Sequence, residues 1–213
     1  MDLKEIVPEY HSKNIFVRGL FLKRLERALQ LVRSKLQSGG ELKIVDLGCG
    51  EGKFLKLIEE NFKNVKTFGI DIEPKVLEIK KFLRAEIRIA DIRNSGFPNV
   101  FFDAVFCLDA LEHFENLENP VSEIKRILKS DGLLIVSLPT ENLFYKLGRL
   151  FTKGTMSEKK GPCSSSHFHN AETIERFLCD NGFNIVKKIS LPSIPFLSLF
   201  HIVSLRKKNN NGK

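Results

Sequence analysis

Apolar residues along this chain follow two different periods. Short runs of β-branched and aromatic residues end at Asp46, Asp71 and Leu108, as expected of strands that are buried in a sheet. Between these runs, apolar residues recur at steps of three and four, as in helices that bury one face. The pattern predicts strands over 43–46, 66–71, 86–90, 102–108, 133–138, 184–190 and 199–206, and helices over 20–36, 53–61, 120–129 and 171–181.

Strands that alternate with helices over some hundred residues predict an α/β fold with a doubly wound, mostly parallel sheet. The last strand is expected to be antiparallel, because the final two strands are joined as a hairpin. We expect a single domain over 1–208, with an N-terminal helical cap (1–40), an insertion or lid after strand five (139–169) and a disordered tail (209–213).

Composition and charge exclude few classes of protein. The 213 residues are 42% hydrophobic and 28% charged, which is typical of a soluble domain. The net charge of +8 could favour nucleic acid, but much of it falls on helices that we expect to be solvated, for example at Lys23, Arg24 and Arg27. The four cysteines have no metal-binding or disulfide spacing, and charged residues interrupt the first ten positions. We therefore expect no signal peptide and a cytoplasmic location.

The most informative stretch follows the first strand. Asp46 is followed by glycines at alternate positions, Gly48, Gly50 and Gly52. Glycines there allow a tight turn and let a ligand approach the backbone. A nicotinamide site would have G-x-G-x-x-G spacing, and a carboxylate at Asp46 would repel its pyrophosphate. The stretch instead favours an uncharged or cationic ligand, which argues against an oxidoreductase.

With this D-x-G-x-G-x-G motif the chain resembles the class I S-adenosylmethionine-dependent methyltransferases. The resemblance implies a seven-stranded Rossmann-like fold, S-adenosylmethionine as cofactor, and a cofactor loop formed by Asp46, Gly48, Cys49, Gly50 and Gly52.

The next two strands also end in acids. Asp71 lies at a strand end 21 residues after Gly50, where it could accept hydrogen bonds from both ribose hydroxyls or cap the next helix. Ile72 would then lie against the adenine. The resemblance further implies that Asp91 accepts from the adenine amine and that the Ile92 amide meets a ring nitrogen.

The fourth strand leads into Asp109-Ala-Leu-Glu112-His113. This step resembles the small-molecule branch of the family, which includes ubiquinone-biosynthesis enzymes. By that resemblance the Leu108 carbonyl would face the cofactor amino group, and Glu112 and His113 would lie near the transferred methyl group. The Asn-Pro-Pro-Tyr step of enzymes that methylate amino groups is absent.

Histidines are the candidates for a general base. His113 is the first choice and His167 or His169 the next, although a structural role for His113 is equally compatible with the sequence. We expect a small-molecule methyl acceptor, no transmembrane segment and no metal. An RNA or tRNA methyltransferase and a non-catalytic cofactor-binding subunit remain alternatives.

Overall fold

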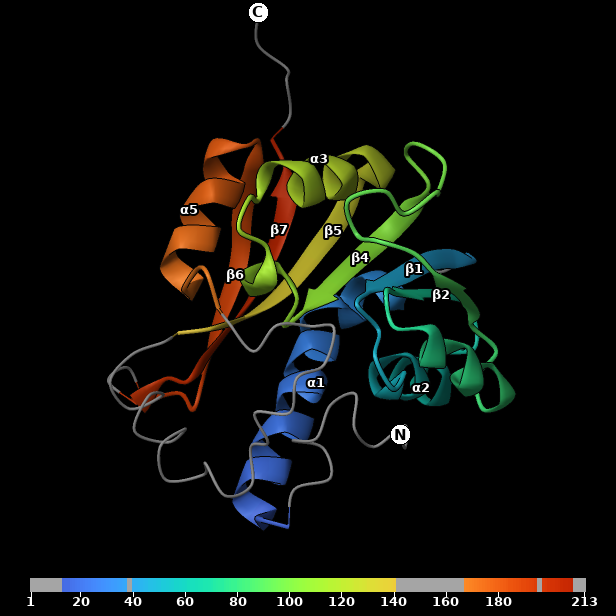
Figure 1. The fold of residues 1–213 in the computed structure, drawn as a ribbon, viewed down its shortest axis with the longest axis horizontal. Helices are drawn as coiled ribbons and strands as arrows, with labels where there is room; N and C mark the ends of the chain where they lie inside the picture. The colour runs from blue at the N-terminus through green and yellow to red at the C-terminus, as the bar shows by residue number, and fades with distance from the viewer. Residues whose placement is uncertain (1–12, 38–39, 141–166, 195–196, 209–213) are drawn as a thin grey trace, which may run out of the picture.

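The apolar runs predicted as strands form one seven-stranded sheet in the computed structural model, which describes residues 13–37, 40–140, 167–194 and 197–208 (Figure 1). The order across the sheet is β3-β2-β1-β4-β5-β7-β6. Strand β7 is antiparallel to both of its neighbours, and the other paired strands are parallel. The predicted fold class is therefore confirmed. The strands are β1 (Leu42–Leu47), β2 (Val65–Asp71), β3 (Glu86–Ile89), β4 (Phe102–Leu108), β5 (Leu128–Pro139), β6 (Phe183–Leu191) and β7 (Phe200–Lys207).

Helices cover both faces of this sheet (Figure 1). Alternate residues of β4 show the two layers: Phe106 belongs to the apolar cluster with α1 and α2, whereas Val105 belongs to the cluster with α3 and α5. This alternation follows from the period of two in a strand. The helices are α1 (Ile15–Leu36), α2 (Lys53–Asn61), α3 (Glu118–Ile127), α5 (Ala171–Asp180) and the 3-10 helices η3 (Pro74–Lys81) and η4 (Leu111–His113).

Most predicted boundaries agree with the structure, but three differ. Helix α1 begins five residues earlier than predicted, at Ile15. Helix α3 begins two residues earlier than predicted, at Glu118, and the Asn116 side chain accepts a hydrogen bond from the Glu118 N–H at 2.7 Å. Strand β5 begins five residues earlier than predicted, at Leu128, and its first part is irregular, because the pairing with β4 jumps from Leu128 to Leu133.

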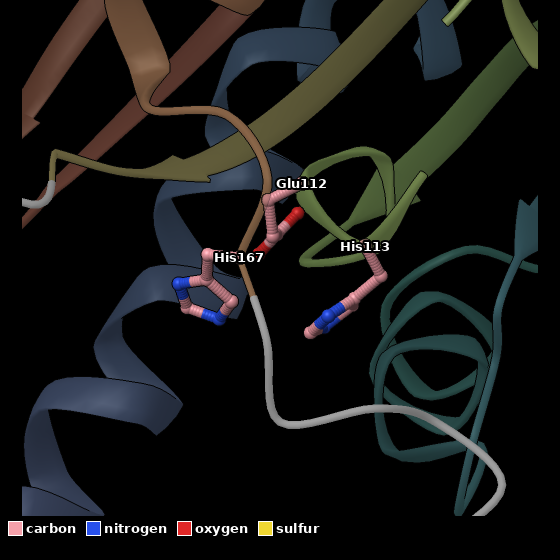
Figure 2. Close-up of side chains that lie close together, drawn as sticks. All are labelled: Glu112, His113 and His167. Carbon is pink, nitrogen blue, oxygen red and sulfur yellow. The ribbon is translucent and has the colours of Figure 1, made fainter. Parts of the chain in front are cut away.

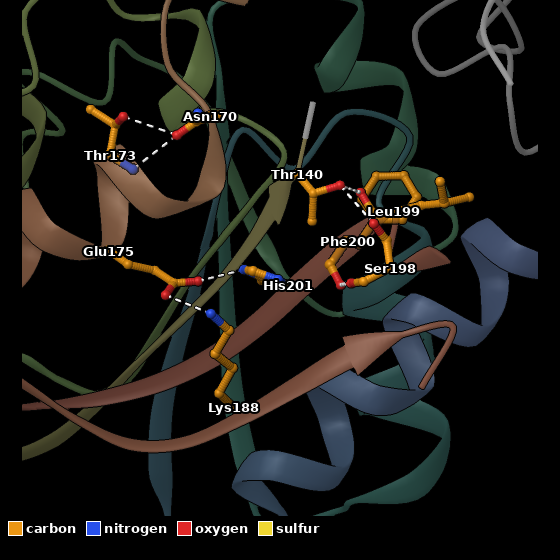
Figure 3. A network of polar contacts seen from close by, with 9 residues as sticks. All are labelled: Thr140, Asn170, Thr173, Glu175, Lys188, Ser198, Leu199, Phe200 and His201. Atoms are coloured by element: carbon orange, nitrogen blue, oxygen red, sulfur yellow. Dashed lines mark hydrogen bonds and ion pairs between the residues drawn. The ribbon is translucent and has the colours of Figure 1, made fainter. Parts of the chain in front are cut away.

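Polar contacts anchor α5 to the sheet, and with it the segment that carries His167 (Figure 3). The Asn170 side chain caps α5, accepting a hydrogen bond from the Thr173 N–H at 3.0 Å. From the same helix, Glu175 contacts Lys188 of β6 at 2.8 Å and His201 of β7 at 2.7 Å. Three elements are thus held together by one largely buried carboxylate.

Parts of the predicted organisation lie outside the described residues. These are most of the predicted lid, the predicted tail and the first part of the N-terminal cap. Among the helices that the structure describes, none has the length and apolar character needed to cross a membrane.

Candidate active site

The glycine turn connects β1 to α2. Gly48, Gly50 and Gly52 all have positive φ, at 78°, 49° and 69°, which glycine adopts without steric cost. A Cβ on Gly52 would lie only 2.7 Å from Leu83 Cδ1, so this position also has no room for a side chain. The turn is fixed to β2, because the N–H groups of Gly48 and Cys49 donate to the Ile70 carbonyl at 2.8 and 2.9 Å.

Asp71 links the end of β2 to the same turn. Its Oδ2 accepts from the Gly50 N–H at 2.8 Å and its Oδ1 from the Glu73 N–H at 2.9 Å. A carboxylate has about four acceptor positions, so capacity remains for ligand hydroxyls. Ile72 follows with 51% of its surface exposed, which makes it an apolar surface beside the acid.

Asp46, at the end of β1, is a buried acid of the site. It is only 3% exposed, and its Oδ1 accepts no hydrogen bond from the described residues. Burial raises the pKa of Asp46 to about 8, and the negative charges of Asp71 and Asp109 act on it in the same direction. A positively charged ligand group beside this atom would offset the cost of its burial. The ammonium of S-adenosylmethionine fits that requirement.

Asp91 has a local partner that the sequence pattern does not indicate. Both of its carboxylate oxygens contact the Arg93 guanidinium, and the shortest of these contacts is 2.6 Å. These hydrogen bonds lower the pKa of Asp91. An adenine amine would have to share the carboxylate with Arg93. Ile92 is buried, and its Cδ1 would be 3.8 Å from a Cβ on Gly48, so the segment after β3 reaches the glycine turn.

The loop after β4 lies against the glycine turn. A Cβ on Gly48 would be 3.3 Å from the Ala110 Cβ. Leu108 ends β4, and Asp109 follows with a φ of 54°, a left-handed conformation uncommon for a residue with a side chain. The Ser137 hydroxyl donates to Asp109 Oδ1 at 3.0 Å. The cofactor turn and the Leu-Glu-His step are therefore neighbours.

Arg24 of α1 is a functional candidate that the sequence pattern did not reveal. It was expected on a solvated helix face, but it is 1% exposed and forms an ion pair with Asp109. Its guanidinium carbon lies 4.5 Å from the Phe21 ring centroid and 4.8 Å from that of Phe200. The available signal was its position between Phe21 and Leu25 on the apolar side of the helix.

The structure brings together three of the four histidine and glutamate candidates: Glu112, His113 and His167 (Figure 2). The two imidazole rings meet edge to face, with centroids 5.1 Å apart. His169 is placed differently, since its Nε2 lies 3.1 Å from the Glu115 carbonyl oxygen. The cluster therefore combines a buried carboxylate with two half-buried imidazoles.

Comparisons with known proteins show similarity to methyltransferases. The profile of a methyltransferase domain family matches residues 15–188. The chain is 28% identical over 196 residues to a malonyl-[acyl-carrier protein] O-methyltransferase of Acetivibrio thermocellus, covering 84% of this chain and 68% of that enzyme. It is 30% identical over 139 residues to a probable tRNA methyltransferase 9B of Bos taurus, covering 64% of this chain but 29% of that protein.

Solved structures show the same fold. The magnesium protoporphyrin IX methyltransferase of Synechocystis, crystallised with bound SAH, superposes with a TM-score of 0.68 at 19% identity. The match covers 96% of this chain and all of the other.

Proposed function

This chain belongs to the class I S-adenosylmethionine-dependent methyltransferases, and from that premise we propose that it methylates a small, non-anionic molecule beside Glu112, His113 and His167. The observation that carries the proposal is the meeting of the glycine turn and the Leu-Glu-His step at one edge of the sheet. Open α/β sheets bind their ligands at such an edge.

The cofactor supplies a methyl group on an electrophilic sulfonium. In our proposal the glycine turn and Asp71 hold the nucleoside, with Asp71 accepting from the ribose and Ile72 lying against the adenine. Asp46 and the Leu108 carbonyl face the ammonium, while Asp91 and Ile92 border the adenine. Fixing the donor in this way favours transfer mainly through orientation.

The charges of the site support a non-anionic acceptor. Asp71 and Glu112 contribute carboxylates to the site, whereas the pairs of Arg24 with Asp109 and of Arg93 with Asp91 add little net charge, and Asp46 is mostly protonated below pH 8 until a cation binds beside it. A polyanion such as RNA would be repelled by these carboxylates. The tRNA methyltransferase relative supports RNA as a second candidate, but this chain covers less than a third of that protein.

An acceptor hydroxyl must lose its proton during transfer, and His113 is our first choice to remove it, with His167 beside it. We expect His113→Ala to slow methyl transfer by about 10²–10⁴-fold, the usual contribution of a general base. S-adenosylhomocysteine affinity should stay unchanged. The assay is transfer of labelled methyl from S-adenosylmethionine into fractions of a cell extract. Equal rates in the two proteins would remove His113 from this role.

The cofactor assignment has its own test. We expect Asp71→Asn to weaken S-adenosylhomocysteine binding by about 1–3 kcal/mol, or roughly 5–150-fold. The reason is that a neutral amide replaces the charged carboxylate that accepts from the Gly50 N–H and, in our proposal, from the ribose hydroxyls. Isothermal titration calorimetry measures the change. Asp131→Asn is the matched control, since it removes an exposed acid that is bound to Lys35. Equal affinity in both variants would refute the ribose role.

A further inference from the structure

Two segments far apart in the sequence bring metal-ligating side chains together on the acceptor side of the site (Figure 2). Glu112 and His113 come from η4, and His167 lies shortly before α5. One ligand atom from each lies within 4.8 Å of the other two. Three donors at this spacing can be bridged by a single ion.

Backbone contacts hold the two segments in register. The Phe168 N–H donates to the Glu112 carbonyl at 2.9 Å, immediately beside two of the three donors. One residue further along, the His169 ring contacts the Glu115 carbonyl at 3.1 Å. These contacts fix the places from which the three side chains project. Such preorganisation reduces the cost of assembling a metal site.

We infer that Glu112, His113 and His167 bind one divalent ion of the zinc type. Two imidazoles and one carboxylate are the donor set of many catalytic zinc sites, which leave a fourth position for water or substrate. Magnesium and calcium prefer sites made of oxygen atoms, so this set discriminates against them. The inference rests on the proposed function only for its consequence for catalysis; binding of the ion can be measured without it.

The spacing is close to what zinc requires. Bonds of about 2.0–2.2 Å in a tetrahedron place ligand atoms roughly 3.4 Å apart. The three atoms therefore have to approach each other by at most about 1.4 Å from their present limit of 4.8 Å. Both histidine side chains are only partly buried. Glu112 is 1% exposed, and a cation beside its carboxylate would stabilise it there.

An ion at this place changes how the acceptor is activated. A hydroxyl oxygen bound at the fourth position would have a lowered pKa, so its proton leaves to solvent before the oxygen attacks the methyl carbon and the carbon–sulfur bond breaks. In the metal-bound protein His113 supplies a ligand atom, so the ion replaces the general-base role proposed above for His113 in the metal-free protein. The methyl acceptor of the proposed reaction is then a molecule whose hydroxyl group is the nucleophile.

The test measures metal binding directly. Protein treated with a chelator and dialysed is titrated with Zn²⁺ and, in parallel, with Mg²⁺ by calorimetry. We expect one Zn²⁺ per chain and binding at least about 100-fold tighter than Mg²⁺. Both His113→Ala and His167→Ala should weaken zinc binding by at least about 100-fold, since even outer-shell changes cost 10–100-fold.

Two controls make the result unambiguous. His201→Gln removes a histidine that contacts Glu175 outside the cluster, and it should leave the zinc affinity unchanged. Cobalt bound in place of zinc should show visible d–d bands without a thiolate charge-transfer band, which excludes the cysteines as ligands.

The outcomes separate the two proposals. No stoichiometric Zn²⁺ binding, or equal binding in both cluster variants and the parent, overturns the metal site, and if S-adenosylhomocysteine still binds, the proposed function is unaffected. Failure of S-adenosylhomocysteine to bind would count against the proposed function instead.

Discussion

Replacing Arg24 with methionine is expected to lower the free energy of unfolding by about 3 kcal/mol, the lower end of the usual cost of breaking a buried ion pair, because the Asp109 side chain that loses its partner is 23% exposed. Arg24 is almost fully buried and forms its ion pair with Asp109. Methionine retains most of the contact with Phe21 and Phe200 but supplies no charge. Urea denaturation of the two proteins measures the difference.

The loss should depend on pH in a defined direction. Burial already raises the pKa of Asp109 above its usual value, and Arg24 is the strongest of the groups that oppose this rise; without Arg24, only Ser137, His113 and His167 oppose it, so the pKa of Asp109 in the folded variant rises further. A raised folded pKa means that the destabilisation grows as pH rises from the unfolded value towards the folded one. We therefore expect a larger loss at pH 8 than at pH 5.5.

A second variant separates charge from packing. Asp109→Asn keeps a side chain that tolerates the left-handed backbone at this position and can still bond Ser137. In the double variant Arg24→Met with Asp109→Asn, the buried charge is gone, and we expect at least half of the lost stability to return. Equal stability of the single and double variants would show that the charge of Asp109 is not the cause.

The strand ends were predictable because local signals agree there. At Asp46 and Asp71 a buried run stops at a polar residue, and the glycine spacing after Asp46 fixes the turn. The hydrophobic period alone therefore gave β2, α2 and β4 to within a residue. Asp71 also bonds to the glycine turn, as acids at neighbouring strand ends can in a parallel sheet.

Side-chain contacts that depend on tertiary packing could not be predicted from local sequence signals. Arg24 was assigned to a solvated face because charged residues usually are, and only the packing of α1 against β7 shows why it is buried. The approach of His167 to His113 depends on how the 167–170 segment crosses η4. The contact of the two histidines has no period or motif in the sequence, and the burial of Arg24 has only its position on the apolar side of the helix as a signal.

Binding of S-adenosylhomocysteine should strengthen as pH rises from 6 to 8, and Asp46 is expected to be the cause. Burial raises the pKa of Asp46 to about 8 in the cofactor-free protein, so the carboxyl is mostly protonated at pH 6. A ligand ammonium beside it favours the carboxylate, and binding then releases a proton. Each step of one in pH within this window can change the affinity by up to about tenfold. Calorimetry in buffers of different ionisation enthalpy measures both the affinity and the released proton.

Asp46→Asn should change affinity and stability in opposite directions. In the cofactor-free protein the pKa of Asp46 rises from 3.8 to about 8 on folding, so the native state holds a proton that the unfolded chain has lost, and stability falls as pH rises through this window. Asparagine carries no charge, so the variant should be more stable than the parent at pH 8. We expect the free energies of unfolding to differ by more than about 1 kcal/mol, because a pKa that differs by one between the folded and unfolded states corresponds to about 1.4 kcal/mol. Its affinity for S-adenosylhomocysteine should be lower at pH 8 and nearly independent of pH. A variant that binds with the parent's pH dependence would show that Asp46 does not face the ammonium.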